Sequence, residues 1–414
     1  MIGALVVSFP RKPRLHIKAQ HKENLFPNST SLIERCHKIA VEARGTGFLD
    51  KQLTVYDAAT SYLLGLTGAY SLKWRQSKLY FGECFTILRS LGLHKSSDSS
   101  ISPGNSPRSS SAEGQDVQIN YIMEEMGRRV FWVLFVGAKS MHQLGASFTD
   151  FFIPPATPRS QYPALPTEVD DICIFPDRIM PQPVGIIPKI VGFNANVRVF
   201  LSYDPLSTFD MTYGSDSCID WEKQNQIVQR CLIACKTSLD GLPRELMLRP
   251  EKHNRDFNSG MYTDENGYHG MNSYPQLDCN DQEAQKRKTQ YEIQKANIYV
   301  SQLGTRSHIV ERYWTLCENS NQGIKAEGQH VGTSTPLRQK SGHNSPYLNH
   351  EGLDHALSHT QPFNVQFSEQ DMATEREEIV RELLVVLSSI SQVNMEPNGG
   401  GLVRYTSIAL ILKI

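Results

Sequence analysis

The chain has 414 residues, of which 39% are hydrophobic and 21% are charged, so it can build a sizeable core yet leaves many residues for loops. Its 42 basic and 43 acidic residues give a formal net charge of −1. This balance excludes an overall electrostatic attraction to nucleic acid or to an anionic membrane. Any DNA contact therefore has to come from a local basic segment or from outside this chain.

Residues 1–50 read as an N-terminal tail or linker. The apolar stretch "IGALVVS" comes before the basic residues Arg11, Lys12 and Arg14, whereas a signal peptide has its basic residues first and a longer apolar core. We therefore expect an intracellular protein. The basic stretch "PRKPRLHIKAQHK" leaves three interpretations open: the remnant of a basic linker, a weak nuclear-import signal, or a solvated tail.

Two adjacent helices are predicted next, in "TVYDAATSYLLGLTGAYSL" and "WRQSKLYFGECFTILRSLGLHK". Thr54 and Asp57 have the spacing of a capping box, and Gly92 supplies the left-handed residue that commonly ends a helix. Apolar residues recur at helical spacing in both segments. The first segment carries Ala59, Tyr62, Leu63, Leu66 and Tyr70, and the second carries Phe81, Cys84, Phe85, Leu88 and Leu91. This pattern favours an antiparallel helix pair.

A helix central to the core is predicted in "YIMEEMGRRVFWVLFVGAKSMHQLGASF", from Tyr121 to Phe148. Two acid-first ion pairs at i,i+4 spacing open it, Glu124 with Arg128 and Glu125 with Arg129. Its middle is apolar nearly all round, which is typical of a buried helix, and the apolar run is too short to span a bilayer. The preceding segment 96–115 is rich in Ser, Pro and Gly, and we expect it to be a mobile insertion.

A proline-rich connector follows, "DFFIPPATPRSQYPALPTEVDD", whose five prolines exclude a helix interior and a central strand. Asp170 and Asp171 end it. A solvated turn or a helix cap is favoured over metal ligation for this pair, since no second acidic cluster accompanies it.

Further helices are predicted over 220–239, over 283–317 with a break near Gly304, and over 368–390, where Ser368 and Asp371 have capping-box spacing. Leu383, Leu387 and Ile390 are among the residues expected to be buried in the last of them. The segments 249–280 and 319–366 are polar and are expected to be disordered loops. The tail 396–414 is atypical, either a buried last helix or an error in the predicted gene. With no competing strand pattern, the fold class is all-α, with long polar loops.

No catalytic motif is present: the sequence lacks a GxSxG elbow, a P-loop, an HExxH helix and a DDxxD box. The densest histidine group, at 343, 350, 355 and 359, has irregular spacing typical of solvated loop residues. The eight cysteines include no CxxC pair, so buried thiols are favoured over a zinc site. We expect no enzyme, and no catalytic, cofactor-binding or metal-binding residue in this chain.

Three motifs, taken in order, resemble the regulatory region of fungal zinc-cluster transcription factors. Leu91, Gly92, Leu93 and His94 are similar to the Leu-Gly-Leu-His-basic sequence that ends a helix there. An acid followed by Arg-Arg-x-Phe-Trp matches Glu125, Arg128, Arg129, Phe131 and Trp132. "YPALPTEVDD" resembles the proline-rich stretch that ends in a pair of aspartates, here Asp170 and Asp171. The resemblance covers residues 54–175 well and 215–395 more loosely.

The resemblance implies an all-helical regulatory module that acts in the nucleus on metabolic genes, those of sugar or secondary metabolism. Its core would be residues 51–245, with a helical continuation over 246–395. In the family, zinc is held by an N-terminal cluster of six cysteines, which this sequence lacks. The chain is then either a truncated activator or a regulator that reaches DNA only indirectly. Its expected partners are other transcription factors or coregulators and a small-molecule effector, with no membrane partner.

One alternative from another class stays open, an all-α enzyme or a lipid- or small-molecule-binding protein. It would need an apolar cavity between residues 62–91 and 130–148. Its support is the aromatic content of the predicted core, and aromatic residues at helical spacing more often fill a core than line a ligand site. The aromatic residues concerned are Tyr62, Tyr70, Phe81, Phe85, Phe131 and Trp132.

Overall fold

The computed structural model describes residues 1–8, 18, 20–21, 25–96, 120–145, 151–214, 220–248, 279–328 and 367–396. Across these ranges the chain forms helices and no strand, apart from two isolated bridges in the connector. The predicted all-α class is confirmed. Most or all of the predicted insertion 96–115, the loops 249–280 and 319–366, the tail 396–414 and the four loop histidines lie outside the described residues.

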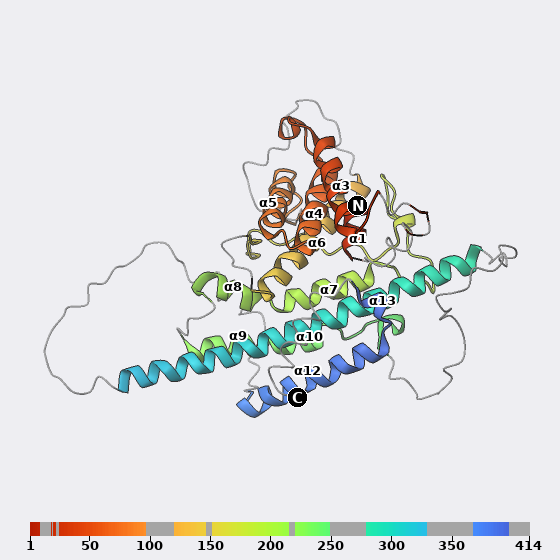
Figure 1. The fold of residues 1–414 in the computed structure, drawn as a ribbon. Helices are drawn as coiled ribbons and strands as arrows, with labels where there is room; N and C mark the ends of the chain where they lie inside the picture. The colour runs from red at the N-terminus through yellow and green to blue at the C-terminus, as the bar shows by residue number, and fades with distance from the viewer. Residues whose placement is uncertain are drawn as a thin grey trace.

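The helices form two groups, one above the other in Figure 1. The upper group contains α1 (Ile2–Ser8), α3 (Ser29–Arg44), α4 (Val55–Tyr70), α5 (Trp74–Ser90) and α6 (Tyr121–Gln143), with the 3₁₀ turn η1 (Phe48–Asp50). The lower group lies along a long helix, α10, and contains α7 (Val191–Ser202), α8 (Asp204–Tyr213), α9 (Trp221–Thr237), α10 (Cys279–Gly328), α12 (Glu369–Ser389) and α13 (Gln392–Met395). The connector joins α6 to α7 and carries η2 (Asp171–Cys173); η3 (Arg244–Leu246) follows α9.

The helix pair α4–α5 forms as predicted, but a different face of α4 is buried. The Thr54–Asp57 capping box is present, and Gly92 has a left-handed φ of 72° after the end of α5. The predicted apolar stripe of α4 is partly wrong, because Tyr70 is exposed and the buried face holds Ala58, Ser61, Leu64 and Gly65. Small residues there let α5 approach closely. Leu91, which follows the last residue of α5, is likewise exposed rather than buried.

Much of the predicted N-terminal tail is folded, which corrects that expectation. Asn28 caps α3, accepting a hydrogen bond from the Ser31 N–H at 2.9 Å. At the other end of α3, Arg44 bonds Glu83 of α5 at 2.6 Å and the Ser61 hydroxyl of α4. The sequence signal was weak because α3 buries no residue completely and relies on these polar contacts.

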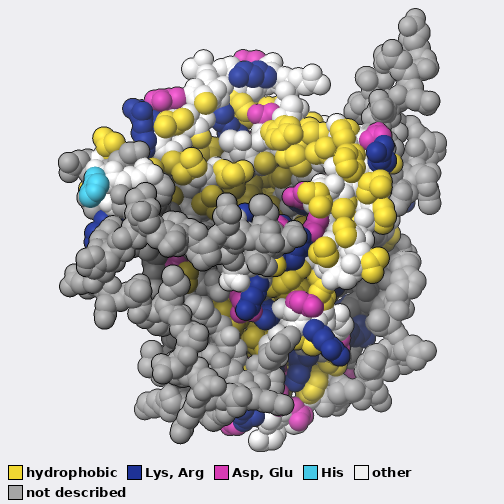
Figure 2. All heavy atoms as spheres, turned by 90° about the vertical axis from the view of Figure 1, so that its right-hand side faces the viewer, with side chains coloured by type: hydrophobic (Ala, Val, Ile, Leu, Met, Phe, Trp, Pro, Cys, Tyr) yellow, Lys and Arg dark blue, Asp and Glu magenta, His cyan; other side chains and the backbone are white. Residues whose placement is uncertain are grey.

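The helix α6 lies at the centre of the upper core, as predicted. Phe131, Leu134 and Phe135 are fully buried, and they pack with residues of α4, α5 and α7 in one hydrophobic cluster. Among the described helices, none combines the length and the apolar content that a bilayer span needs. Figure 2 shows hydrophobic side chains over much of the upper half of one face, with basic and acidic side chains scattered among them.

The lower group differs from the prediction in three places. Helix α10 runs through the buried Gly304 without the expected break and continues past 319, where a loop was predicted. Packing on several sides of α10 offsets the helix-weakening effect of one glycine. Helices α7 and α8 were not predicted, since the Val, Gly and Asn residues of α7 and the Asp, Ser and Thr residues of α8 favour helix weakly. In α12 the capping box is confirmed, whereas Leu387 is exposed.

Charged side chains join α12 to the rest of the lower group. Arg306 of α10 is almost completely buried and binds Glu375 at 2.6 Å and Glu382 at 2.5 Å. Lys236 of α9 also binds Glu375, at 2.5 Å. These pairs fix which face of α12 meets α9 and α10, while Ile379 and Leu383 supply the apolar contact.

The close approach of α4 and α5 gives a test of the packing. A Cβ at Gly65 would lie 2.5 Å from Phe81 Cδ1, whereas a Cβ at Gly82 would meet nothing within 4 Å. We expect Gly65→Ala to lower the free energy of unfolding by about 1–2 kcal/mol through overpacking. We expect the matched Gly82→Ala to raise it by up to about 1 kcal/mol through helix propensity. Chemical denaturation measures both, and equal signs would contradict this packing.

Candidate functional site

The Leu-Gly-Leu-His motif docks the end of α5 onto α6. Leu93 packs against Gly127, where an added Cβ would lie 2.8 Å from Leu93 Cδ1. His94 stands edge-on to Phe85 with ring centroids 6.4 Å apart, and burial, with the nearby Lys95 and Arg89 charges, lowers the pKa of His94. The motif thus serves helix packing. Gly127, against which Leu93 packs, was not identified from the sequence pattern.

The Glu-Arg-Arg part of the second motif is built around one buried carboxylate. Glu125 has a side chain only 3% exposed and accepts hydrogen bonds from both Arg128 and Arg129, at 3.3 and 3.2 Å. It also accepts from the N–H of Thr167 at 3.1 Å and from the Thr167 hydroxyl at 3.2 Å. The predicted i,i+4 pairs both form, the other being Glu124 with Arg128 at 2.7 Å. Glu125 does more than form an ion pair within the helix, since it also ties α6 to the connector.

Phe131 and Trp132 hold the connector from the next turn of α6. The Trp132 indole N–H donates to the Ala164 carbonyl at 3.0 Å. The rings of Phe131, Trp132 and Phe135 surround Tyr162 at centroid distances of 5.7, 5.8 and 5.4 Å. An extended, proline-rich segment is therefore fixed by one indole hydrogen bond and an aromatic cluster.

Asp170 and Asp171 have different environments. Asp171 is 81% exposed and bonds Arg129 at 2.6 Å, in keeping with the predicted solvated turn. Asp170 precedes η2 but is buried, which corrects that expectation, and accepts from the Lys189 N–H at 2.9 Å and from Arg287 of α10 at 2.9 Å. Burial opposes its ionisation, but these hydrogen bonds and one from Gln182 outweigh burial and lower the pKa of Asp170.

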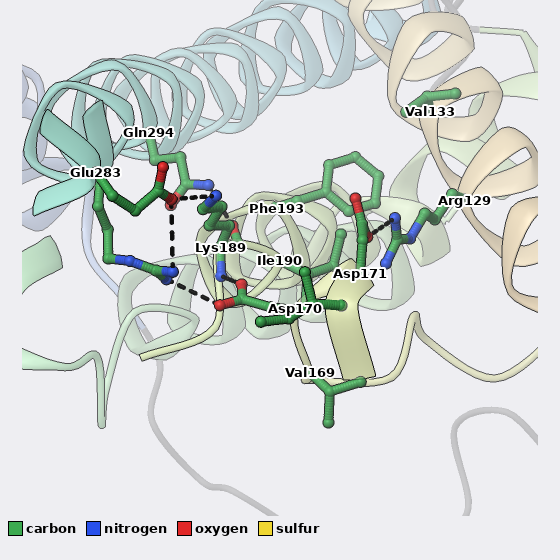
Figure 3. Close-up of a pocket in the computed structure, with 12 residues that line it drawn as sticks. Arg129, Val133, Val169, Asp170, Asp171, Lys189, Ile190, Phe193, Glu283 and Gln294 are labelled. Atoms are coloured by element: carbon green, nitrogen blue, oxygen red, sulfur yellow. Dashed lines mark hydrogen bonds and ion pairs between the residues drawn. The ribbon is translucent and has the colours of Figure 1, made fainter. Parts of the chain in front are cut away.

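A cleft of about 530 Å³ opens where α6, η2, the start of α7 and the first turns of α10 meet (Figure 3). On one side of it Arg129 pairs with Asp171. On the other side the Glu283 carboxylate lies 3.2 Å from Lys189 Nζ and 4.0 Å from Arg287 Nη2. Gln294 of α10 also lines the cleft, and the apolar part of the lining consists of Val133, Val169, Ile172, Ile190 and Phe193.

The structure thus brings Arg129, Asp170 and Asp171 of the predicted residues to the cleft and leaves 91–94 and Trp132 away from its lining. Sequence reasoning missed Lys189, Glu283 and Arg287. The i,i+4 spacing of Glu283 and Arg287 signals an ion pair on a helix. No local pattern, however, predicts that this end of α10 meets the connector about a hundred residues earlier in the chain.

Within the described residues, no group of three or more His, Cys, Asp or Glu side chains is placed to hold a metal ion. Cysteines with free thiols are Cys36, Cys84, Cys173, Cys231, Cys235 and Cys317. Burial raises the pKa of Cys231 and of Cys235 to about 12, so both are protonated thiols inside the core.

No protein-family model, characterised protein or solved structure matches this sequence. The family resemblance accordingly remains a prediction carried by the quoted motifs.

The buried carboxylate of Glu125 has a matched neighbour for a mutational test. Glu124 lies on the same helix with a side chain 32% exposed and a single arginine partner. We expect Glu125→Ala to cost about 3–5 kcal/mol of unfolding free energy, because the Thr167 N–H loses its acceptor and Arg128 and Arg129 each lose their buried carboxylate partner. Glu124→Ala should cost less than about 1 kcal/mol. Similar losses for both variants, measured by chemical denaturation, would contradict a structural role for Glu125.

His142, at the end of α6, gives a pH prediction. Its Nε2 bonds the Phe151 carbonyl at 2.9 Å; burial chiefly, and Lys139 in addition, lower the pKa of His142 to about 4. As the pH falls, His142 therefore takes up a proton near pH 6.5 in the unfolded chain but only near pH 4 in the folded chain. Stability that is fully present above about pH 6.5 should fall by roughly 2 kcal/mol through this group on going to about pH 4.5.

Chemical denaturation of the wild type and of His142→Gln at about pH 6.5 and about pH 4.5 gives the unfolding free energies whose difference measures this contribution. The variant should lose that part of the pH dependence. An unchanged slope would place the source of acid sensitivity elsewhere.

Proposed function

We propose that this chain is a regulatory module of the fungal zinc-cluster transcription factor type. It acts in the nucleus on the transcription of metabolic genes, through other transcription factors or coregulators or in response to a small-molecule effector. One observation carries the proposal: motifs from three separate parts of the sequence, 91–94, 125–132 and 170–171, serve one continuous packing arrangement around α6.

The physical role of each motif supports the proposal. Leu93 needs a glycine on α6 to reach its position, Glu125 needs both arginines to be tolerated in the interior, and Trp132 needs an extended partner for its N–H. The motifs are thus requirements of a common helical scaffold, as expected for a region shared by regulators that control different genes.

DNA specificity, in this proposal, comes from a DNA-bound partner or from a zinc-cluster domain, and the near-neutral charge of the chain agrees with such an indirect role. The alternative of an all-α enzyme or lipid-binding protein needs an apolar cavity beside α4 and α5. There the Phe81 ring stacks on Tyr62 at 5.7 Å and leaves no room for a methyl group at Gly65. We therefore prefer the regulatory function.

Fusion of the full chain to a heterologous DNA-binding domain tests the proposal in a yeast reporter strain. We expect reporter output to change severalfold relative to the DNA-binding domain alone. Glu125→Ala should abolish the change because it disrupts the scaffold, and Glu124→Ala should retain it. Fusion protein that is abundant in the nucleus but leaves reporter output unchanged would refute the proposal.

A further inference from the structure

We propose that the cleft between α6, η2 and α10 binds a small organic anion in which a carboxylate is attached to an apolar body. Its volume of about 530 Å³ is in the range of small-molecule sites, roughly 300–1,000 Å³. The inference deepens the proposed function by naming the chemical class of an effector, and its binding part can be tested without reference to transcription.

Three basic and three acidic side chains line the cleft, and of the acids Asp170 is buried, whereas Asp171 and Glu283 lie toward solvent. The side chains of Arg129, Arg287 and Lys189 are 28, 19 and 39% exposed. The acids that pair with them across the opening, Asp171 and Glu283, are 81 and 53% exposed. A ligand entering the cleft therefore meets positive charge behind a rim of acids that water already solvates.

Each arginine keeps a second bond to a buried carboxylate, which holds it in place. Arg287 donates through Nη1 to Asp170, and Arg129 donates through Nε to Glu125. Those carboxylates are 6 and 3% exposed. The inner bonds can persist when an outer acid leaves, so the basic groups are pre-organised for an incoming anion.

The carboxylate of Glu283 marks where the anionic group of a ligand would lie. One of its oxygens is 3.2 Å from Lys189 Nζ and 4.0 Å from Arg287 Nη2, so a single oxygen meets both cations. Exposed ion pairs of this kind are weak, and a ligand carboxylate can replace the side chain at small cost. In Figure 3, Glu283 and Lys189 lie on one side of the cleft, across from Arg129.

The apolar lining accounts for the second half of the ligand. Phe193 and Ile190 at the start of α7, with Val133 of α6, face the cleft beside the charged groups. An inorganic anion would leave this surface in contact with water. A carboxylate that carries an aromatic or branched aliphatic group would cover it, and each buried methylene would add to the affinity.

Fluorine NMR titration of the full chain tests the inference with a matched pair of probes, 4-(trifluoromethyl)benzoate and 4-(trifluoromethyl)benzamide. The two have nearly the same shape and differ in charge. We expect saturable binding of the benzoate, at least about fivefold tighter than the amide, since a charge-assisted hydrogen bond contributes on the order of 1 kcal/mol or more. Inorganic phosphate should compete weakly.

Three variants localise the binding. Lys189→Met should weaken benzoate binding severalfold and leave amide binding unchanged. Glu283→Gln should strengthen benzoate binding, because it removes the competing carboxylate. Lys288→Met is the control: it removes the same charge from the exposed neighbour of Arg287, which does not line the cleft. Thermal unfolding of each variant verifies that the fold is kept.

The inference would be overturned if benzoate showed no saturable binding below about 10 mM, which corresponds to a binding free energy near 3 kcal/mol. It would also be overturned if the benzoate and the benzamide bound with equal affinity. Benzoate affinity that neither Lys189→Met nor Glu283→Gln changes would be a third contradicting result. The proposed function fails separately. If the chain binds benzoate but the reporter fusion is inactive, the binding site stands and the regulatory role is refuted. If the fusion is active but the chain does not bind benzoate, the regulatory role stands and the binding site is refuted.

Discussion

The position of the connector depends on one buried carboxylate, that of Glu125. An ionised group in the interior is tolerated only when it is paired and its hydrogen-bonding capacity is met, and here two arginines and Thr167 meet it. Because Thr167 belongs to the connector, the hydrogen bonds that it donates to Glu125 also fix the path of the connector. Three residues further on, the connector places Asp170 where Arg287 of α10 binds it. A series of charged hydrogen bonds thus runs from α6 to α10.

The polar series and the hydrophobic cores have different roles. Buried ion pairs rarely add net stability, since the desolvation of the charges offsets their attraction, whereas burial of apolar surface contributes most of the folding free energy. One large cluster lies around α6 and another around α9, α10 and α12. Hydrophobic surfaces tolerate many relative orientations. The hydrogen bonds of Glu125 and Asp170 require particular partners, so they define how the connector sits between the clusters.

The sequence was sufficient where structure is determined locally. Capping boxes at Thr54 and Ser368 and the apolar periodicity of α9 depend on residues within a few positions of each other, and these predictions were correct. The break at Gly304 was wrong because tertiary packing outweighs a local preference. The cleft was only half predictable. Arg129 and Asp171 belong to recognisable motifs, but Lys189 and Arg287 join them through contacts between distant segments, which no local pattern encodes.

The difference between inner and outer acids determines what a bound anion can do at this joint. A ligand shifts an arrangement only by binding one state more tightly than another. At the cleft, Asp170 and Glu125 are buried and hold their arginines, whereas Glu283 and Asp171 are solvated and weakly held. An anion that replaces Glu283 exchanges the direct Lys189–Glu283 pair between the connector and α10 for a bridge in which one ligand carboxylate meets both Lys189 and Arg287, without breaking the inner bonds. Because this bridge needs Lys189 and Arg287 side by side, binding of such an anion would favour the state in which the connector and α10 are in contact.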